Sequence, residues 1–495
     1  MEIQFQKTVV SYLQTLVQQM QTQEETQQVR LSDAMPDIGR VIGSWGQVLL
    51  RGKQWRSDSV SISGGVKVWV LYEPEDGSQP QCVESWVPFQ MNWSIPDADR
   101  DGVVLACPMP PVVDARMLSD RKLMVRTNIR MQACAMVSNQ MDLYTPEEMP
   151  SDVQTLQNNY PMLLPVEAGE KAFELEETIS LPMSEQPLEN VLRYTLEPVL
   201  AEYKLVADKL VLRGAVRLQM LYMGTDERLH SWNTELPFSQ YTQLEDSYES
   251  GAQVMICFGT TDLEMEKGED GALILKAGIV AQYIIYDQKQ IPVVEDMYSP
   301  NRTVRLTVGQ LRLPAVLDMQ DAVFHPEASS KNTPIGIMDA VFLPDVPNMQ
   351  MADDQRNTGL GGTFLLLETD DEGKLQTEAA HWEDHWTIAA SADTDTKIMV
   401  LNIEPIQSMG DTVRTELRIK ALTTMQQPIN VVTGAEIGEA TEPDPNRPSL
   451  ILCRIGEESL WELAKRTGST VEKIRKLNGL DKEPPLGQML LIPVI

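Results

Sequence analysis

Histidine, cysteine and the common catalytic motifs are scarce in this chain. It has four histidines and five cysteines in 495 residues, and no two cysteines form a CxxC pair. A Cys–His catalytic pair would need one of those histidines beside a cysteine, and their spacing indicates none. No GxxxxGK[ST] phosphate-binding loop is present either. We therefore predict a non-enzymatic protein that uses no cofactor.

Long apolar runs are also missing. No uninterrupted apolar segment reaches the roughly 18 residues of a membrane-spanning helix. The start, MEIQFQKTVVSYLQ, lacks the basic residues and the apolar centre of a secretory signal. An odd number of cysteines without CxxC pairs is expected in a reducing compartment. We expect a cytoplasmic protein that does not insert into a membrane.

Basic residues are outnumbered, with 41 Lys and Arg against 72 Asp and Glu and a net charge of −31. The imbalance is uneven, because residues 449–495 carry seven basic and six acidic side chains. The remaining chain is strongly acidic and should repel nucleic acids and anionic membrane surfaces. A chain of this length needs more than one hydrophobic core, so we expect several domains.

The most specific pattern lies in residues 449–495, which the sequence predicts as strand, helix, helix and strand. Ser459 can cap a first helix that Gly468 ends, and Thr470 can start a second helix that stops before Gly479. The stretches SLWELAKRTGSTVEKIRKLNGL and PPLGQMLLIP resemble a LysM domain. That resemblance implies a small module that binds N-acetylglucosamine polymers such as peptidoglycan.

The LysM resemblance also implies a binding groove between the loop before the first helix and the loop before the last strand. We predict partner- or glycan-binding residues there: Glu457, Glu458, Ser459, Trp461, Gly479, Leu480, Asp481, Leu486 and Gly487. The first loop departs from the usual Gly-Asp-Thr/Ser-Leu, because Glu457 adds a side chain and a charge where backbone should approach a sugar. Trp461 could anchor a protein partner at the rim, or pack against the linker or a neighbouring strand.

An internal repeat with an offset of 150 residues runs through the rest of the chain. It is carried by matched residues in the two copies: Gly64, Val66 and Tyr72 recur as Gly214, Val216 and Tyr222, and Cys107 falls on Cys257. Apolar residues alternate with other side chains in both copies, a pattern typical of strands. The sequence therefore predicts a mainly β protein of tandem antiparallel sandwich-like domains that ends in a small βααβ domain.

These patterns divide the chain into seven segments. We expect an N-terminal arm, helical or irregular (1–28), two β domains (29–145 and 174–300) separated by a Pro-rich connector (146–173), a third, eroded copy (301–433), a polar linker (434–448) and the LysM-like domain (449–495). We also expect a short helix within LENVLRYTLEPVLAEYK. The linker should leave the C-terminal domain free to move.

The repeated domains carry a second resemblance. VRLSDAMPDIGRVIG and the strand ending in VLY, like ISLPMSEQPLENVLR with RGAVRLQMLY, resemble the SPOCS domain of spore-forming Firmicutes. Tandem SPOCS domains with a C-terminal LysM module are the arrangement of clostridial spore coat morphogenetic proteins. The resemblance implies a scaffold or adaptor on the mother-cell side of the forespore, with stage IV sporulation protein A as its partner. The alternative is a peptidoglycan-binding protein of the cell wall or spore cortex.

Two further features allow a chemical interpretation. HWEDHW places His381 and His385 four residues apart, as a metal site on a helix would, but Trp382 stands where a zinc protease of the HExxH kind needs Glu. We favour a strand with a polar outer face, and a metal-dependent hydrolase is the third hypothesis. Cys107 and Cys257 occupy equivalent apolar strand positions, and we expect both to be buried as small hydrophobic residues in separate domains.

Overall fold

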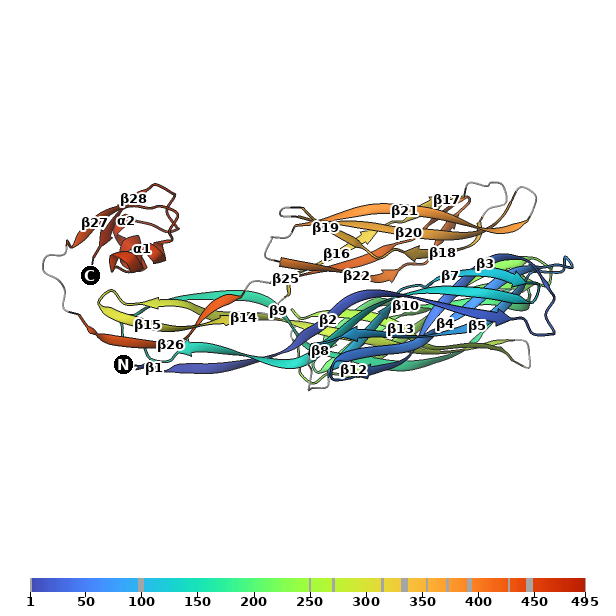
Figure 1. Cartoon of the computed structure of the whole chain (residues 1–495), viewed down its shortest axis with the longest axis horizontal. Coiled ribbons are helices and arrows are strands. Elements are labelled where there is room, and N and C mark those ends of the chain that lie inside the picture. The colour runs from blue at the N-terminus through green and yellow to red at the C-terminus, as the bar shows by residue number, and fades with distance from the viewer. Residues whose placement is uncertain are drawn as a thin grey trace.

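The computed structural model describes residues 2–494 except 97–101, 249–250, 269–271, 313–315, 331–336, 353–354, 371–373, 390–393, 426–427 and 442–447. The described chain is almost entirely β, and two short helices lie near its C-terminus. The molecule is elongated, its long strands run roughly along its long axis, and both termini lie at one end (Figure 1). The predicted fold class, mainly antiparallel β with a C-terminal βααβ domain, is confirmed.

The first unit is a sandwich of two antiparallel sheets. One sheet has β3 (Ile38–Trp55), β4 (Ser59–Pro74) and β5 (Gln81–Ser94), and the other has β2 (Phe5–Arg30), β8 (Lys122–Pro146), β6 (Val103–Pro108) and β7 (Val112–Ser119). Their inner faces share one apolar core, in which Val66, Val68 and Val125 are fully buried. The alternation that the sequence shows along β4 therefore assigns its residues to two buried faces, since Trp69 and Leu71 on the opposite face are also fully buried, against other units.

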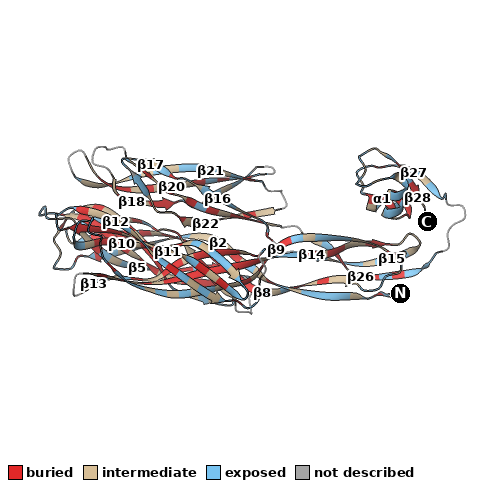
Figure 2. Cartoon of the chain, turned by 180° about the vertical axis from the view of Figure 1, so that it is seen from behind, coloured by how far each residue is buried: buried red, intermediate tan, exposed pale blue. Residues whose placement is uncertain are grey.

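The second unit repeats this arrangement. Its sheets are β10 (Leu188–Val206), β11 (Lys209–Gly224) and β12 (Leu229–Gln243), and β9 (Gln154–Ile179), β14 (Leu273–Tyr298) and β13 (Gln253–Lys267). Val216 and Leu218, on the middle strand, are buried against Leu275 and Ile279 of β14. Figure 2 shows buried residues concentrated where the sheets of the units face one another.

The third unit has the same strand order in a shorter form. One sheet has β18 (Ile337–Pro344), β20 (Gln355–Thr369), β21 (Leu375–Ala389) and the short β19 (Asn348–Ala352), and the other has β16 (Val316–Phe324), β25 (Leu417–Met425) and β22 (Thr394–Ile403). A small sheet of β17 (Glu327–Ser329), β24 (Thr412–Arg414) and β23 (Gln407–Met409) is appended. Phe364 and Leu366 of β20 pack against Leu417 and Ile419 of β25.

The three units are interlocked into one sheet system. A nine-stranded sheet continues from the third unit through β9, β14 and β13 of the second into β3, β4 and β5 of the first. A disulfide between Cys107 and Cys257 joins the first two units, with 6.0 Å between the Cα atoms. The expectation that these cysteines are simply buried hydrophobes in separate domains is therefore wrong, because the equivalent strands of two repeats lie side by side and bring the thiols together.

The ends of the long strands form a second region, which we call the stalk. It contains β1 (Glu2–Ile3), the outer ends of β2 with β8 and of β9 with β14, and the pair β15 (Arg302–Leu311) and β26 (Ile429–Ala440). Each unit contributes one antiparallel pair, and together they enclose small cores around Leu164 and Val294. The stalk extends away from the sandwiches toward the two termini (Figure 1).

Three local predictions about the body are wrong. The N-terminal segment is neither helix nor irregular arm, because β2 pairs with β8 along its length, from Phe5 opposite Pro146 to Arg30 opposite Lys122. The supposed connector is mostly β9, which pairs with β14 throughout. The expected short helix is part of β10. In each case pairing with a distant strand overrides the local pattern.

The C-terminal domain has the predicted order of β27 (Leu450–Arg454), α1 (Leu460–Thr467), α2 (Val471–Asn478) and β28 (Met489–Pro493). Ser459 caps α1 through a reciprocal capping box with Glu462, and Thr470 caps α2. Gly468 and Gly479 end the helices in left-handed conformations that favour glycine. Leu460, Leu463 and Ile474 are fully buried against β28 residues.

Candidate functional site

The structure brings the two predicted groove loops of the C-terminal domain together. The backbone N–H of Gly487 donates to the carbonyl of Ile455 at 2.9 Å, and the Leu460 N–H, at the start of α1, donates to Oε2 of Glu483 at 3.2 Å. A carboxylate is well placed there because the first N–H groups of a helix have no partner within the helix. The second loop therefore contacts the start of α1 through a side chain.

The predicted residues of the first loop are engaged within the domain. Glu458 pairs with Arg466 at 2.7 Å, and Ser459 is committed to the helix cap. The Glu462 carboxylate accepts hydrogen bonds from the N–H and the hydroxyl of Ser459, and these bonds hold the pKa of Glu462 below its ordinary value. Glu457 is exposed to solvent.

The predicted residues of the second loop are arranged around two glycines. Gly479 and Gly487 have φ values of 62° and 86°, and both positions are strained for other residues. Leu480 packs partly into the domain core, whereas Asp481 and Leu486 are exposed. Glu483, which bridges the loops and also pairs with Arg475 at 3.1 Å, was not predicted, because only the fold shows which acidic residue of the loop reaches α1.

Trp461 lies against the stalk. Its ring meets the Tyr298 ring edge-on with centroids 4.7 Å apart, and its Nε1–H donates to Oδ2 of Asp296 at 2.8 Å. Lys465 pairs with the same carboxylate at 2.7 Å. Of the two sequence-based interpretations, packing on a neighbouring strand is the arrangement in this structure, with β14 as the strand.

Tyr298 completes this contact between the stalk and the C-terminal domain. Its hydroxyl donates to the carbonyl of Ser469 at 3.0 Å, and its ring belongs to the same apolar core as Leu460 and Ile474. Burial raises the pKa of Tyr298 to about 12, so this hydroxyl stays a donor at neutral pH. The expectation of a freely moving domain is therefore wrong for this structure. Residues 442–447 of the linker lie outside the described part.

The outer face of the β27–β28 sheet is apolar and exposed. Leu450 and Leu452 of β27 are 52% and 60% exposed, and Met489 and Leu491 of β28 are 51% and 43% exposed. Leu452 lies directly opposite Leu491, and Met489 lies opposite Arg454. We call these four residues the apolar ladder. Contiguous exposed apolar side chains of this kind are typical of interaction surfaces.

The two edges of this small sheet differ. Asn478, at the end of α2, donates to the Leu491 carbonyl and accepts from the Leu491 N–H, so it closes the outer edge of β28. β27 pairs with β28 alone within the described residues. The β27 edge is therefore available to another extended chain.

The alternative chemical candidate is a strand, as predicted. His381 and His385 lie on β21, exposed, whereas Trp382 and Trp386 pack toward the core of the third unit. His381 Nδ1 is 3.0 Å from the Thr363 hydroxyl. Across the described residues, no group of three or more His, Cys, Asp or Glu side chains is arranged to hold a metal ion.

The described chain thus consists of three β sandwiches, a stalk, and a capped βααβ domain of a non-catalytic type. Two family models match it: the SPOCS domain of SipL matches residues 187–267, within the second unit, and the LysM domain matches residues 456–493. The predicted combination of SPOCS and LysM domains is therefore present. No curated protein and no solved structure matches the chain.

These matches establish the coarser functional class. The SPOCS domain associates the chain with sporulation, and the LysM domain is a module of the peptidoglycan-binding type. None of the helices in the described ranges is long and apolar enough to cross a membrane.

Proposed function

We propose that this protein is a non-enzymatic scaffold of spore coat assembly whose LysM domain binds another protein. By resemblance, the partner is stage IV sporulation protein A, and the site of action is the mother-cell side of the forespore. The three SPOCS-like units form the acidic framework, with the third unit (301–433) as a further repeat. The domain boundaries predicted from the sequence remain part of this proposal.

The apolar ladder is the observation that carries the proposal. A polysaccharide groove needs hydrogen-bonding groups, whereas Leu450, Leu452, Met489 and Leu491 offer an apolar surface beside an open strand edge. Burying side chains that are about half exposed contributes on the order of 1 kcal/mol each to the binding of a protein partner. A partner strand added to β27 would also supply main-chain hydrogen bonds.

Charge supports the same partner class. Arg454 lies on the outer face of the sheet, beside the ladder, and the LysM domain has a net charge of +1, whereas the other 448 residues together carry −32. An apolar partner segment flanked by acidic residues would therefore meet this face more easily than the acidic body. Trp461, predicted as a possible anchor, faces the stalk, so we place the contact on the ladder instead.

Paired variants of the full chain test the proposal. Leu452→Asp places a charge in the ladder, whereas Leu486→Asp places one in the groove loop, where Leu486 is also exposed. We expect Leu452→Asp to abolish capture of purified stage IV sporulation protein A and Leu486→Asp to leave it unchanged. Unimpaired capture by Leu452→Asp, with a LysM domain shown to be folded, would overturn the proposed surface.

Peptidoglycan binding is the second candidate, and the LysM match with its two left-handed loop glycines favours it. It predicts that the full chain sediments with purified peptidoglycan and that Leu486→Asp weakens sedimentation while Leu452→Asp does not. The same two variants thus give opposite results under the two candidates.

A further inference from the structure

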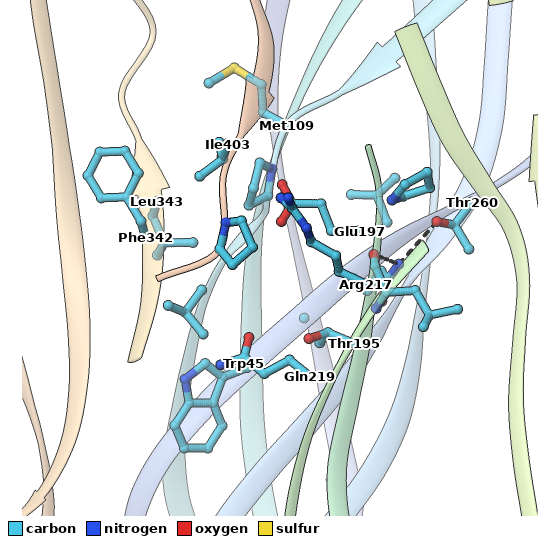
Figure 3. Close-up of a pocket in the computed structure, with 18 of the residues that line it drawn as sticks. Trp45, Met109, Thr195, Glu197, Arg217, Gln219, Thr260, Phe342, Leu343 and Ile403 are labelled. Atoms are coloured by element: carbon cyan, nitrogen blue, oxygen red, sulfur yellow. Dashed lines mark hydrogen bonds between the residues drawn. The ribbon is translucent and has the colours of Figure 1, made fainter. Parts of the chain in front are cut away.

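A cavity of about 510 Å³ lies where the three units meet. The corresponding strand of each unit contributes to its wall: Ser44 to Val48 of β3, Thr195 to Pro198 of β10, and Ala340 to Leu343 of β18. Figure 3 shows side chains from all three units around it. Its volume falls within the roughly 300–1,000 Å³ of small-molecule sites, which are concave and mostly apolar.

The wall contains the same register position from each repeat, with different chemistry. At this position Gln47 of β3 pairs with Lys67 of β4, Glu197 of β10 pairs with Arg217 of β11, and Val341 of β18 pairs with Leu365 of β20. Gln47, Glu197 and Val341 all line the cavity. The repeats thus place an amide, a carboxyl and an apolar side chain at equivalent positions, which makes the cavity chemically asymmetric.

Most of the wall is apolar or already satisfied. Trp45, Val341, Leu343 and Leu365 contribute apolar surface, and Figure 3 shows Trp45 and Leu343 beside the cavity. The Gln47 side-chain amide is already hydrogen-bonded: its Nε2 donates to the Leu196 carbonyl and the Thr260 hydroxyl, and its Oε1 accepts from the Leu196 N–H. Its amide therefore holds the first unit to the second and offers little to a ligand.

The ionisable residues of the wall are Glu197, Arg217 and Glu235. Arg217 donates through Nε to Glu235 at 3.0 Å and pairs through Nη2 with Glu404 at 2.7 Å. Its Nη1 is buried and has no hydrogen-bond partner among the described residues. A buried donor without a partner costs free energy, which an acceptor oxygen of a ligand would recover.

The charges around this donor are balanced. Glu404 and Glu235 already oppose Arg217, and Arg418 lies 3.6 Å from Glu404. Burial, reinforced by Glu404 and reduced by Arg217 and a backbone hydrogen bond from Ile403, raises the pKa of Glu197 to about 8. Glu197 is then mostly protonated at pH 7. A ligand anion would compete with Glu404, and a ligand cation would face Arg217.

We propose that this cavity between the three units is a binding site for an uncharged apolar ligand that carries an amide or similar carbonyl group. The carbonyl oxygen accepts a hydrogen bond from Nη1 of Arg217, and the apolar part lies against Trp45, Val341 and Leu343. This site is separate from the LysM domain, so it goes beyond the proposed function and does not depend on it.

Three compounds with one apolar body and different polar groups test the ligand class. N-acetylphenylalaninamide is neutral, N-acetylphenylalanine is an anion, and phenethylamine is a cation at pH 7. Titration calorimetry with the full chain should show binding of the neutral amide at least about tenfold tighter than that of either charged compound, since one buried hydrogen bond or charge mismatch is worth about that factor. Preference for a charged compound, or binding of none at millimolar concentration, would overturn the proposal.

Two variants locate the binding. Arg217→Lys keeps the charge but removes the guanidinium donor, and it should weaken binding of the neutral amide about tenfold. Arg213→Lys is the matched control on the same strand, because Arg213 is exposed and pairs with Glu202 outside the cavity. Thr195→Phe fills the cavity and should abolish binding. Full affinity in Thr195→Phe, or equal affinities in the two arginine variants, would place the ligand elsewhere.

The pH dependence provides a separate readout. Protonated Glu197 can donate to the ligand, and the charged groups that act on it are Arg217 of β11 and Glu404 after β22. Binding of the neutral amide should weaken as the pH rises through about 8, when Glu197 loses its proton. Glu197→Gln keeps a donor at every pH, so its affinity should stay constant between pH 7 and 9. A wild-type profile that is flat over this range would contradict the role of Glu197.

Discussion

The LysM domain and the three-unit body are stabilised on different scales of sequence separation. Most of the LysM core comes from residues 450–493, and Tyr298 of β14 adds to it. Ser459 bonds Glu462 only three residues further on, and the strand pair brings Leu450 to Pro493. In the body, β2 pairs with a strand more than 90 residues away, and a disulfide spans 150 residues. The comparison shows that the body depends on contacts between repeats, whereas the LysM domain depends on local signals.

The largest effect should come from the buried ion pair between the second and third units. Arg193 pairs with Asp339, both nearly inaccessible, and the guanidinium stacks 4.8 Å from the Trp45 ring of the first unit. Arg193→Ala leaves Asp339 buried without its counter-ion, so we expect a loss of about 3–5 kcal/mol in the unfolding free energy of the body. Urea denaturation measures it.

The exposed Arg213 provides the control for this substitution. Arg213→Ala should cost less than about 1 kcal/mol, because its pair with Glu202 is open to solvent. Equal losses in the two variants would show that the contact between units contributes little. In both variants the LysM transition should stay in place.

Removal of the disulfide should have the next largest effect. Replacing Cys107 and Cys257 by Ser should lower the stability of the oxidised body by about 2–4 kcal/mol, because the unfolded chain gains the freedom of a long loop. Thiol labelling of the denatured, unreduced wild type should count three free cysteines, Cys82, Cys134 and Cys453. Five labelled thiols in protein from an oxidising buffer would contradict the pairing.

The cap of α1 tests whether local contacts stabilise the LysM domain independently of the body. Ser459→Ala removes the side-chain half of the capping box, in which the Ser459 hydroxyl accepts from the Glu462 N–H, and should cost the LysM domain about 1 kcal/mol without affecting the body. Thr470→Ala, at the cap of α2, should cost less, because the Thr470 hydroxyl accepts from the Lys473 N–H, whereas the Ser459 hydroxyl both accepts from the Glu462 N–H and donates to the Glu462 carboxylate. Thermal unfolding, followed by the signal of the two helices, measures the loss of stability in each variant. A shift of the body transition in Ser459→Ala would mean that the two regions fold as one.

The smallest effect concerns the contact between the two regions. Asp296→Asn removes the charge that pairs with Lys465 and weakens the hydrogen bond from Trp461. These contacts are partly exposed to solvent, so we expect their loss to cost less than about 1 kcal/mol. We expect a longer maximum dimension in small-angle scattering, with unchanged unfolding of both regions. Asp287→Asn, elsewhere on β14, is the control. No difference between the two variants would show that Tyr298 alone holds the domain.

The candidate site was predictable to the extent that it is local. Ser459, Gly479 and Gly487 have the cap and turn conformations that their sequence positions suggest. The partners of Trp461 and the link from Glu483 to α1 were not predictable, because each depends on a residue brought close only by folding. The cavity between the units left no local signal, since Glu197 and Arg217 look like ordinary exposed residues of alternating strands.

The amino-acid sequence by itself determined the LysM domain and the β character of the body, because caps, turns and alternation act between near neighbours. Tertiary structure alone decided that residues 1–28 and the supposed connector are long strands, that Cys107 meets Cys257, and that the LysM domain rests on β14. A strand gains its stability from the neighbour it pairs with, and that neighbour lies far away in the chain.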